Sequence, residues 1–378
     1  MGALLSALGK NPRAAWGRAV AAAAAAAILG SAMIRSHQGL QSERKLCQRA
    51  GQKLAGVWDD EAKRRIEQAF LSTKQSYART AWQTVERSLD AHAREWIASR
   101  TEACEATYVR AEQSAAACEL RALCLEQRLS EAKALTALFA RADAQMVQGA
   151  VKAIQALSSL KTCSAHQAIR SKLKAPDDLS MRAQVEEVRA RIAEAKMLHA
   201  TGNHARAAEV ANAAVEAANL LGYKPLRAEA LYALAQNEER RGERAAAQAA
   251  LEDAIIAAQA SSHDEVAAKA WILLVSVVGY QQGRAEEAQR LARFAGAAVE
   301  RLGPEHPLEG QMHQVLGRVF AAQNEHAQSL ASFERAVAIK QRSRGGEDPE
   351  LAEALHELGM ARARLGQYPQ ALEDHQRA

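Results

Sequence analysis

Five cysteines are the side chains with the most specific chemistry in this chain: Cys47, Cys104, Cys118, Cys124 and Cys163. A structural zinc site would need closely spaced pairs such as C-x-x-C with nearby histidines, and the sequence has neither. A disulfide needs Cα atoms within about 7 Å, whereas residues six or fourteen apart on one helix are about 9 or 21 Å apart. Cys118 therefore cannot pair with Cys124 or Cys104 unless a turn intervenes. Disulfides between different helices, with one thiol left over, and buried free thiols both remain open.

Catalytic motifs are absent from the sequence. It has no G-x-G-x-x-G loop, V-A-I-K lysine, H-R-D or D-F-G, which a protein kinase needs for ATP binding and phosphoryl transfer. The stretch "GALLSALGK" has the wrong glycine spacing for a phosphate-binding loop, G-x-S-x-G and H-E-x-x-H are missing, and "HELG" at His356 is half a motif. We therefore expect a non-catalytic chain with no cofactor, no metal and no small-molecule substrate.

The cysteines lie in a region that is predicted to be helical. Residues 57–148 contain neither glycine nor proline, and apolar residues recur at helical spacing, as in Trp82, Leu89 and Trp96. Each helix thus has an apolar face to bury, which predicts a helical bundle over residues 47–165. Short oxygen-bearing side chains that can cap a first turn mark three helix starts, Asp59, Thr80 and Asp143.

An alanine-rich stretch, "GRAVAAAAAAAILGSAMIR", precedes this region. Residues 14–34 would form a helix about 31 Å long, enough to cross the roughly 30 Å hydrocarbon core if Arg18 extends toward the headgroups. We expect this stretch to be a transmembrane helix that follows a juxtamembrane segment, residues 1–13. A signal peptide cleaved near Gly30-Ser31-Ala32 and a soluble alanine-rich helix are the alternatives.

The charge distribution agrees with a membrane-proximal N-terminus. Residues 1–50 carry seven Lys or Arg and one acidic residue, Glu43, whereas the other 328 residues carry 42 basic and 43 acidic ones. The basic segment suits anionic lipid headgroups. Because the rest of the chain is nearly neutral, we expect no nucleic-acid partner.

The C-terminal half is periodic. A linker, residues 166–180, precedes an array over residues 181–378 in which a turn is followed five residues later by a small residue and seven later still by alanine. The turn residues are spaced by 40, 41, 41 and 42 positions: Gly202, Gly242, Gly283, Asn324 and Gly366. This pattern predicts about five helix-turn-helix units.

The fifth unit, "AEALHELGMARARLGQYPQALEDHQRA", resembles the tetratricopeptide repeat. The matching residues are Leu355, Leu358, Gly359, Gly366, Tyr368, Ala371 and Ala378. The resemblance is to the longer form seen in kinesin light chains, and it implies an all-α fold with a right-handed superhelix after the bundle. Gly359 and Ala371 are expected to pack closely. The last unit stops inside its second helix, so we expect a truncated array that leaves the face of Leu372 uncovered.

The cysteine region is similar to the segment after the membrane helix in bacterial transmembrane serine/threonine protein kinases. Trp82, Trp96, "RTEACEAT", "RAEQS" and "CLEQRL" carry this resemblance. It implies that Cys118 is the unpaired thiol, because the other four cysteines match cysteines of that family. It also favours a membrane anchor, with the bundle and repeats outside the cytoplasm, although the kinase domain itself is absent.

Repeat arrays of this kind bind protein segments along the concave face formed by successive first helices. The expected function is a membrane-anchored, single-pass interaction or sensing region, the C-terminal part of a receptor-type kinase; the alternative is a secreted or periplasmic scaffold without a kinase. The pattern places these residues on the concave face: Lys196, His199, Tyr232, Gln236, Arg240, Tyr280, Gln281, Gln314, Arg318, His356 and Arg364.

Overall fold

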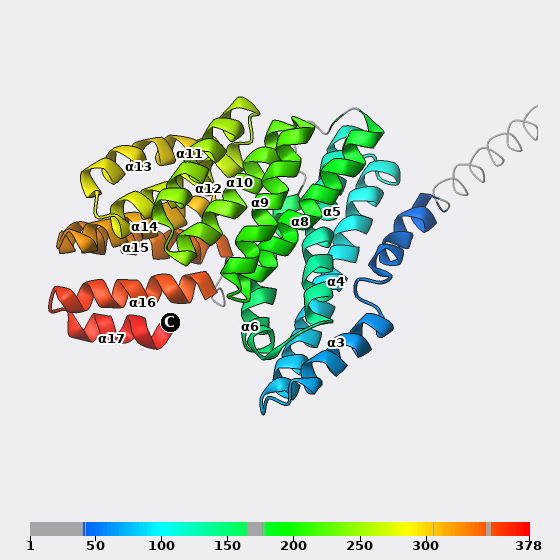
Figure 1. Cartoon of the computed structure of the whole chain (residues 1–378), viewed down its shortest axis with the longest axis horizontal. Helices are drawn as coiled ribbons and strands as arrows, with labels where there is room; N and C mark the ends of the chain where they lie inside the picture. The colour runs from blue at the N-terminus through cyan, green and yellow to red at the C-terminus, as the bar shows by residue number, and fades with distance from the viewer. Residues whose placement is uncertain (1–40, 42, 165–175, 177, 305, 345–348) are drawn as a thin grey trace, which may run out of the picture.

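The computed structural model describes residues 41, 43–164, 176, 178–304, 306–344 and 349–378. All regular elements in these residues are helical, which confirms the all-α prediction (Figure 1). None of the helices in the described ranges has both the length and the hydropathy to cross a membrane. The predicted transmembrane helix, residues 14–34, lies outside those ranges.

The N-terminal region is a helical bundle whose core contains three packed aromatic side chains. Phe70, Trp82 and Phe139 come from three different helices and meet edge-on, with ring centroids 6.2 and 5.3 Å apart. Trp96 is buried nearby and its indole Nε1 donates to the carbonyl of Leu125 at 2.7 Å. The elements are η1 (Gln48–Leu54), α3 (Asp60–Ser72), α4 (Ala78–Tyr108), α5 (Ala115–Phe139), α6 (Ala144–Gln155) and η2 (Leu160–Cys163).

Two of the three predicted helix starts are confirmed. Asp59 caps α3 by accepting a hydrogen bond from the Ala62 amide, and Asp143 caps α6 by accepting one from the Met146 amide, both at 2.8 Å. The prediction for Thr80 is wrong, because α4 already begins at Ala78, after Tyr77, which makes no side-chain cap. The turn before α4 is closed by backbone hydrogen bonds, such as that from the Ala78 amide to the Gln75 carbonyl.

Two disulfides connect different elements of the bundle. Cys47 pairs with Cys104 on α4, and Cys124 on α5 pairs with Cys163 at the end of η2, with Cα atoms 5.5 and 5.6 Å apart. Cys118 is a buried free thiol. The family resemblance implied that Cys118 is the unpaired thiol, and this is confirmed.

The C-terminal region consists of five helix pairs. Helix direction changes along the stack, from upright at α8 to nearly horizontal at α16 in Figure 1. The pairs are α8 (Leu179–Ala200) with α9 (His204–Leu221), α10 (Lys224–Arg241) with α11 (Arg244–Ala260), α12 (Asp264–Val275) and η3 (Ser276–Gln281) with α13 (Ala285–Glu300), α14 (Pro307–Ala322) with α15 (His326–Arg344), and α16 (Pro349–Arg364) with α17 (Tyr368–Arg377).

The predicted turn residues have the backbone conformation that ends a helix. Gly202, Gly242, Gly283 and Gly366 have φ between 71 and 83°, and Asn324 has φ 61°. Glycine reaches this left-handed region without steric cost, and asparagine tolerates it better than most other residues. The turn spacing in the sequence thus located every helix pair correctly.

Small residues let the two helices of a unit approach closely. A Cβ atom added to Gly317 would lie 2.7 Å from the Phe333 ring, and one added to Gly359 would lie 2.8 Å from the His375 ring and 3.1 Å from the Ala371 carbonyl oxygen. The packing role predicted for Gly359 and Ala371 is confirmed. His375 occupies in the last unit the place that Phe333 has in the preceding one.

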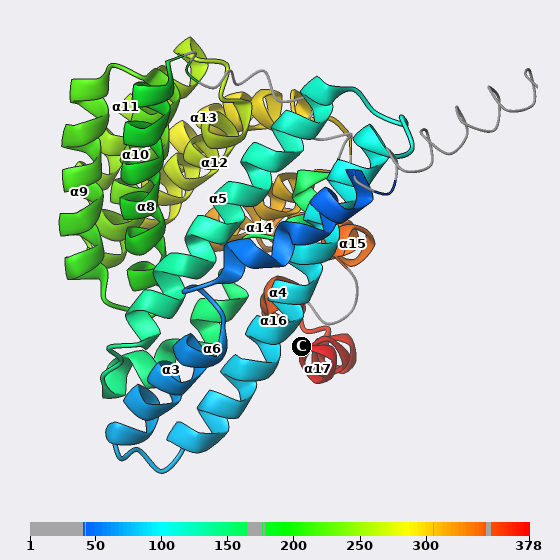
Figure 2. The same ribbon diagram turned by 90° about the vertical axis from the view of Figure 1, so that its right-hand side faces the viewer.

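Helix α8 belongs to both regions. Its residues Met197, Leu198 and Ala200 are buried in the same apolar cluster as Trp96 and Leu125 of the bundle. Its other side packs on α9 and α10. In Figure 2 α5 lies directly against α8, so the bundle covers the end of the array that the first unit would otherwise expose.

Candidate protein-binding face

The first helices of the units form the inner layer of the array. Helices α8, α10, α12 and α14 contact one another in series, and α9 and α11 lie on the outer side (Figure 2). The predicted face therefore consists of residues on neighbouring helices. Which of those side chains can meet a partner depends on the bonds they already make.

Lys196 lies on α8, at the end of the array next to the bundle, and is bonded to residues of the bundle. Its Nζ lies 2.8 Å from Glu131 Oε1 on α5 and donates to Ser158 Oγ at 2.6 Å. Burial lowers the pKa of Lys196, and Glu131 partly offsets this effect. Burial alone would raise the pKa of Glu131, but Lys196 and Arg128 hold it below its usual value. Lys196 thus joins two regions of the chain.

His199 also bonds to the array itself. Its Nδ1 lies 2.9 Å from Oδ1 of Asn237, whose amide nitrogen donates to the Ala233 carbonyl at 2.8 Å. Because the Asn237 oxygen accepts, His199 Nδ1 must carry the hydrogen in this pair. The ring packs against His204 at 4.9 Å. Burial lowers the pKa of His199 to about 4, so the ring is neutral at pH 7.

On α10 the three predicted residues differ in exposure. Tyr232 is half-buried and packs against the apolar cores, and burial raises its pKa. Gln236 is half-buried, and its side chain makes no hydrogen bond to any part of the chain that the structure describes. Arg240 is exposed, with Nε 3.5 Å from Glu239 Oε2.

On η3, Gln281 donates to Glu239 Oε1 of α10, which connects two neighbouring first helices. Tyr280, the preceding residue, is 55% exposed. It is the exposed aromatic side chain among the predicted residues, since Tyr232 is half-buried.

Toward the C-terminus, Gln314 and Arg318 lie in a polar network between α14 and α16. Gln314 is buried and donates to Glu357 at 2.8 Å, while Lys340 Nζ on α15 donates to the Gln314 oxygen at 2.7 Å. Arg318 forms ion pairs with Glu357 and, at 2.8 Å, with Glu353. These bonds connect the fourth and fifth units.

His356 and Arg364, both on α16, are exposed. The His356 ring lies 4.9 Å from that of His375 on α17. The structure thus places the predicted residues along the first-helix layer, but most of them stabilise it, and Arg240, Tyr280, His356 and Arg364 are its exposed members.

The sequence analysis missed the acidic partners in these contacts: Glu131, Glu239, Glu353 and Glu357. It also missed a partly buried ion pair between Arg189 and Glu229, with His263 Nε2 3.3 Å from the Glu229 carboxylate. Burial would raise the pKa of Glu229, but Arg189 and His263 lower it to about 2. Glu131 lies in the bundle, and the others bond to residues of a neighbouring unit, so no local spacing identifies these contacts.

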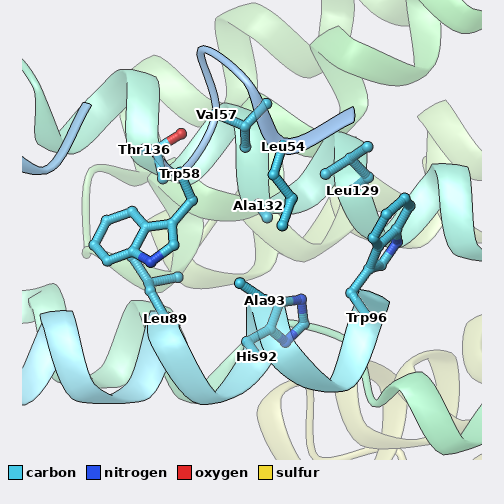
Figure 3. Close-up of a pocket in the computed structure, with 10 residues that line it drawn as sticks. All are labelled: Leu54, Val57, Trp58, Leu89, His92, Ala93, Trp96, Leu129, Ala132 and Thr136. Carbon is cyan, nitrogen blue, oxygen red and sulfur yellow. The ribbon is translucent and has the colours of Figure 1, made fainter. Parts of the chain in front are cut away.

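A small cavity lies within the bundle between η1, α4 and α5 (Figure 3). Trp58, Leu89 and Trp96 line it together with His92, whose Nε2 is buried without a hydrogen-bond partner among the described residues. Its volume of about 10 Å³ is close to the space that one water molecule needs. The cavity has no room for a substrate.

Comparison with known proteins gives a family match over the last three units. The tetratricopeptide repeat profile matches residues 266–342 and 323–378. No curated protein sequence matches the chain.

Solved structures with a similar arrangement include a Podosopora anserina putative kinesin light chain with nearly identical TPR-like repeats, at 20% identity and TM-score 0.41, which covers 51% of this chain and 93% of that one. BtubC (BKLC) from P. vanneervenii is 20% identical with TM-score 0.44, and the match covers 62% of this chain and 87% of that one. Aspartyl phosphate phosphatase F from Bacillus subtilis is 14% identical with TM-score 0.39, and the match covers 87% of this chain and 94% of that one. From the profile match, residues 266–378 of this chain are tetratricopeptide repeats.

Proposed function

We propose that the chain is a membrane-anchored, non-catalytic interaction or sensing region whose repeat array binds a protein segment. The observation that carries this proposal is the first-helix layer, which leaves Arg240, Tyr280, His356 and Arg364 exposed. Tyrosine and arginine are the residue types that often dominate binding energy in protein interfaces.

The two disulfides support a location outside the cytoplasm. Disulfides persist in oxidising compartments and are rare in the cytosol. In this chain they lie in the region that directly follows the alanine-rich stretch. A single-pass anchor over residues 14–34, with bundle and array on the extracytoplasmic side, agrees with both features.

Membrane fractionation tests the anchor. We expect the protein to stay with carbonate-washed membranes. Recovery in the soluble fraction with a new N-terminus near Met33 would instead support the secreted or periplasmic scaffold.

The proposed link to a receptor-type serine/threonine kinase rests on the sequence resemblance of the cysteine region. Reading the DNA upstream of Met1 tests it most directly. An in-frame kinase domain ending shortly before Leu4 would support the link, whereas an unrelated upstream gene and a ribosome-binding site at Met1 would contradict it.

A further inference from the structure

The segment before α3 is held on the bundle as a strap. The strap, residues 47–58, consists of η1 and the residues that flank it. Its side chains Leu54, Val57 and Trp58 are buried and form one wall of the cavity between η1, α4 and α5. Lys53 of the strap pairs with Glu126 of α5. The strap therefore covers the apolar side chains of α4 and α5 that form the other walls.

The strap is attached at both ends, but the attachment is covalent only at its start. Cys47 forms the disulfide to Cys104 of α4. At the other end, Trp58 Nε1 donates to Asp90 Oδ1 on α4 at 2.8 Å. Gly56 has φ 74°, and a Cβ atom there would meet no atom within 4 Å. Because glycine adopts left- and right-handed conformations at little cost, Trp58 can move about Gly56 while Cys47 stays bound.

One titratable side chain faces the strap across the cavity. In Figure 3, His92 of α4 lies between Trp58 and Trp96, with Leu54 of the strap on the opposite side. Its Nε2 is buried and has no hydrogen-bond partner in the part of the chain that the structure describes. The side chain as a whole is half-buried, so a proton from the solvent can reach the ring.

Protonation of His92 is unfavourable while the strap covers it. The charged ring carries an N–H on both nitrogens, and an unpaired charged donor among apolar side chains has a large desolvation cost. Burial accordingly lowers the pKa of His92 below 6.5. A released strap lets water reach the ring, so the open form binds the proton more tightly. Acid therefore shifts the equilibrium toward the open form.

The charges around this imidazole do not offset the cost of burying it. The charged residues of the strap are Arg49 and Lys53, and its sequence contains no acidic residue. Burial has the largest effect on the pKa of the imidazole; Glu95 of α4 and Glu131 of α5 raise that pKa, and Arg128 of α5 lowers it. The strap thus offers a protonated ring no carboxylate.

Asp90, which holds the end of the strap, does not respond in the same pH range. Burial would raise the pKa of its carboxyl group, but Lys63 and the Trp58 indole hold it below its ordinary value. Lys63 Nζ of α3 lies 2.7 Å from Asp90 Oδ1. The carboxylate therefore stays charged near pH 6.5, where a solvated histidine takes up its proton.

We propose that the strap is an acid-sensitive cover of the bundle. Protonation of His92 releases Trp58 from α4 and exposes the apolar walls of the cavity, while the disulfide of Cys47 keeps the start of the strap in place. Return to neutral pH closes the strap, because the uncharged ring no longer needs hydration.

Hydrogen exchange of the full chain between about pH 7 and pH 5.5, corrected for the intrinsic pH dependence of exchange, tests the strap. The amides of Val57 and Trp58 are the probes, since both donate to the Leu54 carbonyl, at 3.0 and 2.9 Å. Their protection should fall by up to about tenfold at about pH 5.5, one unit below the pKa of a solvated histidine. Unchanged protection in the wild type would overturn the proposal.

Variants assign the response to the ring. His92→Gln and His92→Leu cannot be protonated and should keep the same protection at both pH values. His313→Gln is the matched control, because His313 of α14 is also half-buried and burial lowers its pKa as well. It should lose protection in the strap as the wild type does. An equal loss in the His92 variants would show that another group opens the strap, and the proposal would be wrong.

Trp58→Phe tests the attachment independently of the histidine. It keeps an aromatic ring but removes the N–H that bonds to Asp90. Protection of the Val57 amide should then be lower already at pH 7 and should fall further in acid. Wild-type protection in this variant at pH 7 would mean that the end of the strap is not held at Asp90, which contradicts the proposed release.

Discussion

Glu131 on α5 and Lys196 on α8 form an ion pair, with Oε1 and Nζ 2.8 Å apart, across the junction between bundle and array. Glu131 also accepts hydrogen bonds from the amide and the hydroxyl of Ser158, at 2.8 and 2.9 Å. The disulfide of Cys124 and Cys163 holds the segment that follows Ser158 to the same helix, α5. One carboxylate therefore connects three segments of the chain.

Replacing this carboxylate should destabilise the junction. Glu131→Ala leaves Lys196 and Ser158 without their partner, and we expect a loss of about 2 to 3 kcal/mol in the free energy of unfolding. The matched control is Glu209→Ala, because Glu209 pairs with Arg206 on the surface of α9 and should contribute less than about 1 kcal/mol. Equal denaturation midpoints for the two variants would contradict a central role for Glu131.

The disulfides should stabilise the bundle while Cys118 should not. Replacing both Cys124 and Cys163 by alanine removes a loop closure across 39 residues and should cost about 2 to 5 kcal/mol. Cys118→Ala removes one small buried group and should cost about 1 kcal/mol. Chemical denaturation of the oxidised protein measures both changes, and peptide mapping without reduction should show two linked pairs that spare Cys118.

Two glycines in helices should respond to alanine in opposite directions. Gly317→Ala places a Cβ atom 2.7 Å from the Phe333 ring and should cost about 1 to 3 kcal/mol. Gly296→Ala, within α13, meets only the Met312 sulfur at 3.9 Å and should stabilise the helix by about 0.5 to 1 kcal/mol. Thermal unfolding of the two variants gives the sign of each change in stability. A shift of the midpoint in the same direction for both would show that the close approach of Phe333 is not what requires Gly317.

His199 should make the array less stable in acid. Its pKa falls from 6.5 to about 4 on folding, because burial disfavours the charged ring. Between these values the unfolded chain binds more protons than the folded one, so stability should fall as the pH drops from 6.5 toward 4. His199→Gln should reduce this slope by up to one proton, which unfolding midpoints measured between pH 4 and 6.5 will show.

The sequence identified the helix pairs because turn chemistry is local. A residue that can adopt positive φ is needed at each turn, and Gly242 or Asn324 reports this need without reference to its neighbours. The identity of the unpaired cysteine, Cys118, followed only from the family resemblance. Which of the other four cysteines pair with each other could not be predicted, since spacing excludes pairs on one helix but does not select among different helices. Local information thus determined the units but not their connections.

The bonding of the candidate residues could not be predicted for the same reason. Lys340 and Gln314 are 26 positions apart, and their hydrogen bond depends on how α14 and α15 cross. The π-helical conformation of η3 (Ser276–Gln281) also does not alter the turn spacing, which is 41 residues on both sides of Gly283. It is visible only in the backbone hydrogen bonds, in which the Arg284 amide bonds to the Val278 carbonyl, six residues earlier.

The last unit offers a test of the apolar face predicted at Leu372. This residue is 60% exposed on α17, whereas Leu330, at the corresponding position of α15, packs against the cluster of Leu351, Leu355 and Leu358. Leu330→Glu should therefore cost about 2 to 4 kcal/mol, because it places a charge against that cluster.

Leu372→Glu should leave the unfolding midpoint nearly unchanged and reduce self-association, since exposed apolar patches promote association. Thermal unfolding and sedimentation velocity over a range of concentrations separate the two effects. Because each unit contacts mainly its neighbours, hydrogen exchange of α8 and α9 should be unaffected by either change. An equal loss of stability in both variants would mean that Leu372 is covered in solution, and the prediction of an open face at α17 would be wrong.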